Sequence, residues 1–305
     1  MILSLLLSSF LTFVELNCEN LFDTSHDVGK EDSEFLPDGK RFWTRTRYWG
    51  KLNRIGQEIL SCSDHLPDLV ALVEVENDSV LHQLTRRSLL RNAGYEYLMT
   101  TSPDVRGLDV ALLYQPASFR PLCYESLEVP VLPEMRPTRD ILYVQGQIIT
   151  GDTLHIYVVH APSRYGGEKE TRPYRMKVAE IISRQVKMHH QERVIVTGDF
   201  NDYFDDASLK YLEESSLVNV TKNTVGVCGE AKGTYRFQGE WRSLDHFFCS
   251  KRVADCVEST YINDNAFLLD DDVRFGGKRP LRSYNGIRFQ KGFSDHLPLI
   301  VKFKF

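Results

Sequence analysis

A β-branched run that leads into Gly-Asp-Phe-Asn constrains this chain more than any other feature. Residues 194–197 are typical of a buried strand of about five residues. Gly198 lets the backbone turn at the end of that strand without a steric penalty. Asp199 and Asn201 then stand two residues apart at the rim of a sheet, where an acceptor and an amide can bind water and a phosphate oxygen. The same pattern also occurs in an ordinary turn, so it needs support from elsewhere in the chain.

Five further apolar runs carry a polar or titratable group at one end. These groups are Asn17 with Glu19, Glu74, His160, Asp245, and the adjacent pair Asp295 and His296. Each alone has an ordinary reading, such as a strand cap, a salt-bridged strand end or a surface histidine. Six runs of the same polarity predict one shared rim at which these side chains meet.

The motifs and their order resemble those of the endonuclease/exonuclease/phosphatase superfamily, which includes pancreatic deoxyribonuclease, exonuclease III-type nucleases, inositol polyphosphate 5-phosphatases and neutral sphingomyelinases. The resemblance runs from about Thr12 to Phe305 and is more specific for the superfamily than for a substrate. It implies an α/β fold, a four-layer α/β sandwich in which two packed mixed β-sheets are flanked by helices. Helical patterns at residues 48–62, 80–92, 172–190 and 206–215 agree with that fold.

The composition predicts a globular protein with a large core. The 305 residues are 42% hydrophobic and 26% charged. The motifs are spread from end to end and no linker or short-period repeat separates them, so we expect a single domain over residues 11–305. Six cysteines without zinc spacing do not fix the compartment.

The first ten residues are apolar, like the core of a secretory signal. They lack a basic segment and an Ala-x-Ala cleavage site, and they are too short to span a membrane. They are either a truncated signal peptide or the lead-in to the first strand. The pattern slightly favours a secreted or periplasmic protein, leaves a cytoplasmic one open, and predicts no integral membrane association.

Hydrolysis of a phosphodiester needs an activated water and neutralisation of charge on the phosphoryl oxygens. Mg²⁺ or Mn²⁺ would provide the neutralisation, and both prefer oxygen ligands. We expect Glu74 to be the primary metal ligand, with Glu76 as a rival carboxylate further out. Asn17 and Glu19 would complete the metal shell directly or through water, and Asp295 would close it from the last strand.

Two histidines are candidates for contact with the phosphate. His296 would contact the scissile phosphate and the attacking water, and the resemblance implies that Asp245 fixes its tautomer. His160 would protonate the leaving oxygen or bind the phosphate, and Asp109 is a candidate for its orienting acid.

The Gly-Asp-Phe-Asn motif supplies the remaining candidates. Asp199 would orient or deprotonate the water, and Asn201 would donate a hydrogen bond to a phosphate oxygen. The choice of general base between Asp199 and His296 stays open.

Two basic stretches could bind substrate. Arg164, Arg172 and Arg175 follow His160 and can form forked contacts with phosphate oxygens, although the same residues also suit a solvated helix start. Basic and aromatic residues alternate over residues 41–49, as in a stacking platform for bases. A helix that packs on the core explains that stretch equally well.

Three functions are compatible with these features. The first is a metal-dependent nuclease, which the basic and aromatic stretches favour. The second is a phosphatase or phosphodiesterase on a small or lipid phosphoester, which the net charge of −5 and the pI near 6.0 favour. The third is an inactive binding module, which would require the loss of a site residue, and the core set is intact. We expect a monomer whose partner is nucleic acid or a small phosphoester.

Overall fold

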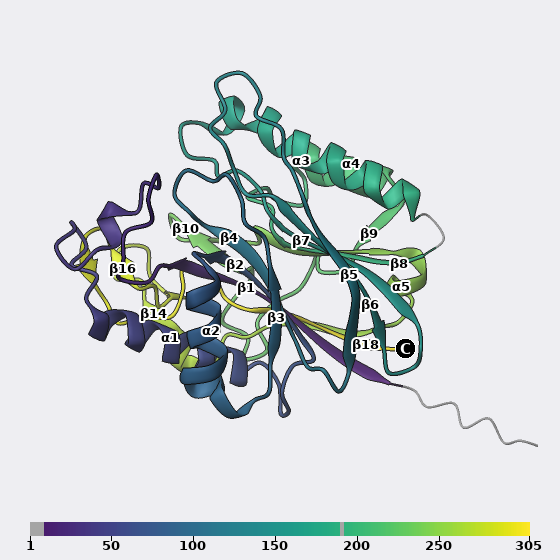
Figure 1. Ribbon diagram of the computed structural model, residues 1–305, viewed down its shortest axis with the longest axis horizontal. Helices are drawn as coiled ribbons and strands as arrows, with labels where there is room; N and C mark the ends of the chain where they lie inside the picture. The colour runs from purple at the N-terminus through teal and green to yellow at the C-terminus, as the bar shows by residue number, and fades with distance from the viewer. Residues whose placement is uncertain (1–8, 190–191) are drawn as a thin grey trace, which may run out of the picture.

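The structure is a computed structural model that describes residues 9–189 and 192–305. The first eight residues of the expected apolar leader therefore lie outside the described residues. Two six-stranded sheets form the centre of the molecule (Figure 1).

The first sheet has the strand order β13-β18-β1-β2-β4-β3. Its strands are β1 (Phe10–Leu21), β2 (Leu69–Val75), β3 (Glu96–Met99), β4 (Asp109–Tyr114), β13 (Val257–Ile262) and β18 (Leu299–Lys304). The second sheet has the order β5-β6-β7-β8-β12-β9. Its strands are β5 (Phe119–Leu127), β6 (Ile141–Ile148), β7 (Thr153–His160), β8 (Arg193–Asp199), β9 (Leu217–Asn219) and β12 (Asp245–Ser250).

Helices cover the outer face of each sheet (Figure 1). Those of eight residues or more are α1 (Arg45–Leu60), α2 (Asp78–Arg87), α3 (Glu168–Met188) and α4 (Ala207–Glu214). The shorter elements are α5 (Lys251–Ala254), η1 (Ser33–Phe35), η2 (Leu89–Asn92) and η3 (Ala266–Leu268), together with the hairpins β10–β11 (Tyr235–Phe237, Glu240–Arg242), β14–β15 (Leu269–Asp271, Lys278–Pro280) and β16–β17 (Tyr284–Asn285, Arg288–Phe289).

Three clusters of buried apolar residues fill the three interfaces between the four layers. Along β2, Leu69, Ala71 and Val73 face the second sheet, whereas Val70 and Leu72 face α1 and α2. A third cluster lies between the second sheet and the helices α3 and α4. Strands with apolar residues on both faces are buried on both sides, which confirms the expected four-layer sandwich.

One expected helix is interrupted. The pattern over residues 80–92 predicted a single helix, but α2 ends at Arg87 and a short 3-10 turn follows. Ser88 has extended backbone angles and its hydroxyl accepts a hydrogen bond from Leu90 N at 3.1 Å. The serine thus caps a new turn instead of continuing the old one.

The strand directions bring the motifs to one end of both sheets. β1 and β2 are parallel, and β18 is antiparallel to β1, so the start of β18 lies beside the ends of the other two. In the second sheet, His160 and Asp245 are both directly opposite Asp199 across the ladder. The two sets of strands therefore deliver their polar ends to a common rim.

Within the described ranges, no helix is long and apolar enough to cross a membrane.

Candidate active site

A pocket of 170 Å³ lies at this rim. Seven of the residues expected from the sequence line it: Asn17, Glu74, His160, Asp199, Asn201, Asp295 and His296. They come from strands of both sheets and from the segments that follow β8 and precede β18, so the pocket depends on the packing of the two sheets face to face.

Glu74 reaches the pocket through a β-bulge. The pairing of β2 with β4 shifts register between Val73 and Val75, and Glu74 between them has a φ of 61°. Residues other than glycine rarely adopt this left-handed conformation. The bulge turns the side chain out of the ladder. One carboxylate oxygen accepts a hydrogen bond from Asn20 N at 2.7 Å, and the other lies 3.7 Å from His160 Nε2.

Asp199 is held by close packing of β7 and β8. Gly198, with a φ of 139°, approaches Val159 so closely that a Cβ would lie 1.9 Å from the Val159 carbonyl oxygen. A glycine is therefore required immediately before the carboxylate. Asp199 Oδ2 accepts a hydrogen bond from Asn17 Nδ2 at 3.0 Å, and Oδ1 accepts one from Asn201 N at 2.8 Å.

The surroundings of Asp199 move its titration toward neutral pH. Burial raises its pKa to about 7, the positive charge of His296 opposes this, and the charges of Asp245 and Glu74 add to it. Asn201 also donates from Nδ2 to the Ala161 carbonyl oxygen at 3.0 Å. An amide nitrogen has two protons, so this contact leaves one for a further acceptor.

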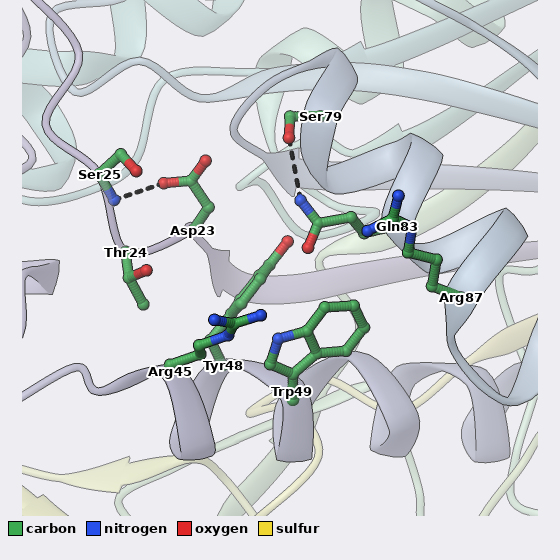
Figure 2. Close-up of a pocket in the computed structure, with 9 residues that line it drawn as sticks. All are labelled: Asp23, Thr24, Ser25, Arg45, Tyr48, Trp49, Ser79, Gln83 and Arg87. Atoms are coloured by element: carbon green, nitrogen blue, oxygen red, sulfur yellow. Dashed lines mark hydrogen bonds between the residues drawn. The ribbon is translucent and has the colours of Figure 1, made fainter.

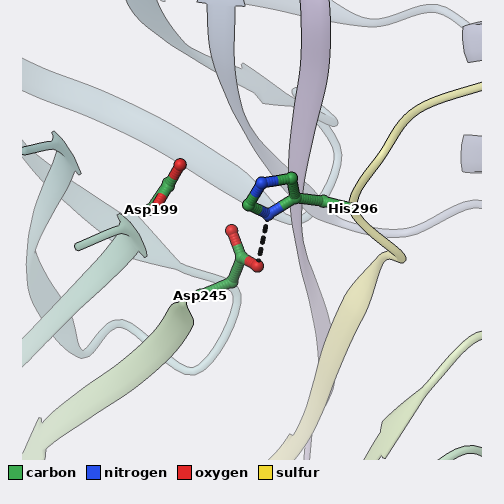
Figure 3. Close-up of side chains that lie close together, drawn as sticks. All are labelled: Asp199, Asp245 and His296. Carbon is green, nitrogen blue, oxygen red and sulfur yellow. Dashed lines mark hydrogen bonds and ion pairs between the residues drawn. The ribbon is translucent and has the colours of Figure 1, made fainter. Parts of the chain in front are cut away.

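His296 and Asp245 form a buried pair (Figure 3). His296 Nδ1 lies 2.7 Å from Asp245 Oδ2, and the Thr234 hydroxyl donates to the same oxygen. Burial disfavours the imidazolium, but the charge and hydrogen bond of Asp245, with the charges of Asp199 and Asp295, raise the pKa of His296 well above its usual value. The contact with Asp245 occupies Nδ1 of His296, so Nε2 of the same ring remains available for another partner.

His160 has the opposite electrostatic environment. Burial and the neighbouring charges of Arg139, Arg106 and His296 lower its pKa well below the usual value, so the ring is neutral. Nε2 lies 3.7 Å from both Glu74 and Asp199. Nδ1 is buried, and within residues 9–189 and 192–305 it has no hydrogen-bond partner.

Asp109 does not orient His160, contrary to the sequence-based expectation. Its carboxylate accepts hydrogen bonds from the Thr100 hydroxyl at 2.5 Å and from Ser102 N at 2.9 Å. These contacts fix the loop before β4, and Asp109 makes no hydrogen bond to His160, whose Nδ1 is without a partner among the described residues.

Glu19 also differs from its expected place in the metal shell. It does not line the pocket, because its carboxylate accepts a hydrogen bond from Ser283 N at 2.6 Å and lies 3.8 Å from Lys51 Nζ. Arg282 bridges it to the pocket wall, with Nε 3.4 Å from Glu19 and Nη2 2.8 Å from Asp295. Glu19 therefore supports the wall that carries Asp295.

The three expected substrate arginines bind acidic residues of the protein. Arg175 is buried and its Nε donates to Asp202 at 2.6 Å. Arg172 donates to both oxygens of Glu168 at 2.9 and 3.0 Å. Arg164 lies 3.2 Å from Asp206 and stacks on the ring of Tyr203. The partners of Arg175 and Arg164, Asp202 and Asp206, come from the loop after β8, a long-range contact that the sequence pattern does not reveal. The partner of Arg172 lies one turn earlier on the same helix.

Five lining residues were missed by the sequence analysis: Asn20, Arg106, Ser163, Tyr235 and Leu244. Asn20 belongs to the Asn-Cys-Glu-Asn motif and could have been found there. Tyr235 packs its ring 4.9 Å from that of His296. It comes from the β10–β11 hairpin, which has no distinctive sequence signal.

The residues of the pocket fit a divalent cation. Within the described ranges, one group of three side chains has ligand atoms all within 4.8 Å of one another, namely Asp199, Asp245 and His296. His296 Nδ1 is already bonded to Asp245, however, and a hard cation prefers oxygen. The carboxylates of Glu74, Asp199 and Asp295 line the same pocket, and carboxylate oxygens are ligands that suit Mg²⁺ or Mn²⁺.

Comparison with protein families matches residues 12–304 to the Endonuclease/Exonuclease/phosphatase family. No curated protein sequence matches the chain.

Solved structures with the same fold include an endonuclease/exonuclease/phosphatase family protein from Bacteroides thetaiotaomicron, with 16% identity, 98% of each chain covered and a TM-score of 0.65. D. rerio TDP2 complexed with single strand DNA product has 16% identity and a TM-score of 0.59 over 97% of this chain and 100% of the other. The mannosyl-6-phosphatase Bt3783 of B. thetaiotaomicron has 16% identity and a TM-score of 0.59 over 95% of this chain and 98% of the other.

Proposed function

This chain belongs to the endonuclease/exonuclease/phosphatase family of phosphoester hydrolases, and from that premise we propose that it is a divalent-metal-dependent nuclease. The reaction would be attack of water, in line with the leaving oxygen, on a phosphodiester of nucleic acid. The observation that carries the proposal is the convergence of Glu74, Asp199, His160 and the Asp245–His296 pair on one pocket.

Glu74, Asn17 and Asp295 are the residues that would hold the metal. When bound, Mg²⁺ or Mn²⁺ supplies neutralising charge to the phosphoryl oxygens. Asn20 N fixes one oxygen of Glu74, which leaves the other for coordination.

We assign the general base to Asp199. Asn17 and the backbone of Asn201 orient its two oxygens, and a pKa of about 7 suits proton transfer near neutral pH. The raised pKa of His296 makes it a cation, which argues against it as the base. Its Nε2–H would donate to a phosphoryl oxygen while Asp245 holds the ring.

His160 would bind the phosphate as a neutral donor. Its lowered pKa disfavours the alternative role of protonating the leaving oxygen. Arg106 lines the same pocket and would add a positive charge beside the phosphate.

A cavity beside the pocket supports nucleic acid as the substrate. It has a volume of 430 Å³, and its lining residues Ser243 and Tyr203 stand one and two positions along the chain from Leu244 and Asn201 of the catalytic pocket. Aromatic and basic side chains line it: Tyr203, Phe204, Trp241, Lys222, Lys232 and Arg242. Stacking surfaces interleaved with cations suit a single strand better than a bare phosphomonoester.

The second candidate is a phosphatase or phosphodiesterase on a small phosphoester. Its support is the net charge of −5 and the likeness to a mannosyl-6-phosphatase, which has the same fold. The catalytic pocket of 170 Å³ is small enough to accept one phosphate group.

Parallel assays with one protein preparation separate these candidates. The protein is incubated with Mg²⁺ or Mn²⁺ and single-stranded DNA, duplex DNA, RNA, a sugar phosphate, an inositol polyphosphate or a chromogenic phosphodiester. The proposal expects the highest kcat/KM on a single-stranded nucleic acid. A higher value on the sugar phosphate or inositol polyphosphate would make the second candidate the function.

A further inference from the structure

A second pocket, of 290 Å³, lies between the loop that follows β1 and the helices α1 and α2 (Figure 2). The side chains that matter below are Asp23 from the loop, Arg45, Tyr48 and Trp49 from α1, and Gln83 and Arg87 from α2. Among the described residues, none lines both this pocket and the catalytic one. The volume is near the lower end of the range for small-molecule sites, roughly 300–1,000 Å³.

Two helices build most of the lining of this pocket. Arg45, Tyr48 and Trp49 lie in the first two turns of α1. Gln83 and Arg87 are four residues apart on α2 and therefore share one face of that helix.

The Tyr48 hydroxyl is the feature that points to a ligand. The residue is only 3% exposed, and within residues 9–189 and 192–305 its oxygen has no hydrogen-bond partner. Figure 2 shows this hydroxyl at the centre of the pocket, between Asp23 and Gln83. Burial, together with the charges of Asp23 and Glu76, raises the pKa of Tyr48, so the group stays an O–H donor. A buried donor without an acceptor is unfavourable, and a ligand oxygen or nitrogen would satisfy it.

Two arginines flank the same pocket. Arg45 and Arg87 are exposed, and neither forms an ion pair with any residue in the described part of the chain. Figure 2 shows Arg45 beside the rings of Tyr48 and Trp49, and Arg87 beside Gln83. A guanidinium group forms paired hydrogen bonds with phosphate oxygens.

Polar side chains near the arginines suit the edge of a base. Asp23 provides a carboxylate, with Oδ1 bonded to Ser25 N at 2.6 Å, and Gln83 provides an amide held by the Ser79 hydroxyl at 3.0 Å. The Asp23 charge disfavours a small anion that would sit deep in the pocket. The half-buried Trp49 offers an aromatic surface of the kind on which bases stack.

We propose that this second pocket binds a nucleotide, with its base on Trp49 and against Tyr48, Gln83 and Asp23, and its phosphate on Arg45 and Arg87. The nucleotide is either free or one unit of a single strand. The site goes beyond the proposed hydrolysis, since no catalytic residue contributes to it.

Calorimetric titration of the full chain in EDTA tests the proposal without any hydrolysis. The probes are the four 5′-ribomononucleotides, a single-stranded DNA hexanucleotide and inorganic phosphate. At least one mononucleotide should bind, and Arg45→Ala or Arg87→Ala should weaken its binding about tenfold or more, the effect of losing a charge-assisted hydrogen bond. Arg91→Ala is the matched control, because it removes the same charge from a nearby residue outside the pocket; its affinity should equal that of the wild type.

Tyr48→Phe separately tests the role of the Tyr48 hydroxyl, which has no hydrogen-bond partner among the described residues. The affinity should fall about fivefold, as expected for one neutral hydrogen bond, while the melting temperature stays equal or rises. Unchanged affinity in Tyr48→Phe would contradict the ligand contact.

The remaining outcomes locate the ligand. Weaker binding of both mononucleotide and hexanucleotide in Arg87→Ala identifies a unit of a strand, and weaker binding of the mononucleotide alone identifies a free nucleotide. Three results would overturn the site: no binding of any nucleotide, binding lost in His160→Ala but kept in Arg87→Ala, or inorganic phosphate bound as tightly as the nucleotides. Each of them is read in EDTA and measures binding alone, so the cleavage assay of the proposed function can fail or hold independently.

Discussion

Glu74 lies in the catalytic pocket in a backbone conformation that residues with a side chain seldom adopt. Its φ is 61°, and Asn201 in the same pocket has a φ of 51°. Such residues are unfavourable by roughly 1–3 kcal/mol each, and they persist only where surrounding contacts fix them. The hydrogen bonds from Asn20 N to Glu74 and from Asn201 N to Asp199 are such contacts.

Glu74→Gln should abolish turnover and leave the fold intact. The amide keeps the shape of the side chain but removes the charge that would hold the metal, so kcat/KM should fall about 100-fold or more. Steady-state kinetics at saturating Mg²⁺ and a melting curve check both parts. Glu258→Gln, at an exposed position of β13, is the control. Unchanged turnover would exclude Glu74 as the primary ligand.

Asp245→Asn should damage activity nearly as much as His296→Ala, about 100-fold or more. In Asp245→Asn, His296 loses the negative charge that raises its pKa, and a neutral amide replaces the carboxylate that accepts from Nδ1. Because the raised pKa keeps the ring cationic, the alkaline limb of the kcat profile should move to lower pH in Asp245→Asn. The double variant should be no worse than His296→Ala. Independent, multiplying effects would show that the two residues do not act as a unit.

The residues of this site differ in how far the sequence predicts them. Glu74, His160 and Asp199 follow apolar runs, so strand polarity alone brings them to one rim. Arg175 could not be placed from the sequence, because its partner Asp202 is brought near only by packing of α3 on the loop after β8. Glu19 was misplaced, since the irregular pairing after Asn17 turns it toward Ser283.

At the scale of elements, α1 carries two buried charged side chains across the outer face of the first sheet. Lys51 donates to the Ser283 hydroxyl at 2.7 Å and to the Phe293 carbonyl oxygen, which ties the helix to the loop before β18. Glu58 is fully buried, and among the described residues neither of its carboxylate oxygens has a hydrogen-bond partner.

Glu58→Gln should stabilise the protein at alkaline pH. Burial raises the pKa of Glu58 to about 8, with Lys51 opposing and Glu19 adding to the shift. The protonated form is thus favoured in the folded state, so the wild type loses stability as the pH rises from about 4.5 through 8. At pH 9 the variant should gain up to about 4 kcal/mol, with little change at pH 4. Denaturant unfolding at both pH values measures this.

Glu214→Gln, at an exposed position at the end of α4, is the control for Glu58→Gln. It should follow the pH dependence of the wild type. A parallel pH dependence of Glu58→Gln and the wild type would contradict a buried, neutral Glu58.

Arg164→Ala should lower stability and leave KM unchanged. The guanidinium lies near Asp206, Asp202 and Glu168, and so it joins the start of α3 to the loop before α4. Loss of these partly exposed pairs should destabilise by about 1 kcal/mol, roughly 2 °C in melting temperature. A raised KM with an unchanged melting temperature would instead support the sequence-based interpretation that Arg164 contacts a phosphate of the substrate.

Helix boundaries and strand pairings also differ in how far the sequence predicts them. The helices α1, α3 and α4 lie within a few residues of the predicted ranges, because their apolar periodicity is strong. The register of β2 against β4 was not predictable, since the bulge at Glu74 arises from contacts with β1 and β4 and not from a local signal.

On the scale of the whole molecule, the catalytic pocket depends on two sheets that pack face to face. Asn17 and Glu74 belong to the first sheet, and His160 and Asp199 to the second. The family match over residues 12–304 spans all of these strands, in keeping with the expectation of one domain over residues 11–305, which stays a prediction.

The central claim is metal-dependent hydrolysis at this shared rim, and one measurement tests it most directly. A single-stranded oligonucleotide is incubated with the wild type and with Asp199→Asn, each in Mg²⁺ and in EDTA, and the products are separated by length. We predict cleavage by the wild type in Mg²⁺ alone, and a loss of about 100-fold or more in Asp199→Asn with an unchanged melting curve. Equal cleavage by the variant, or by the wild type in EDTA, would contradict the account.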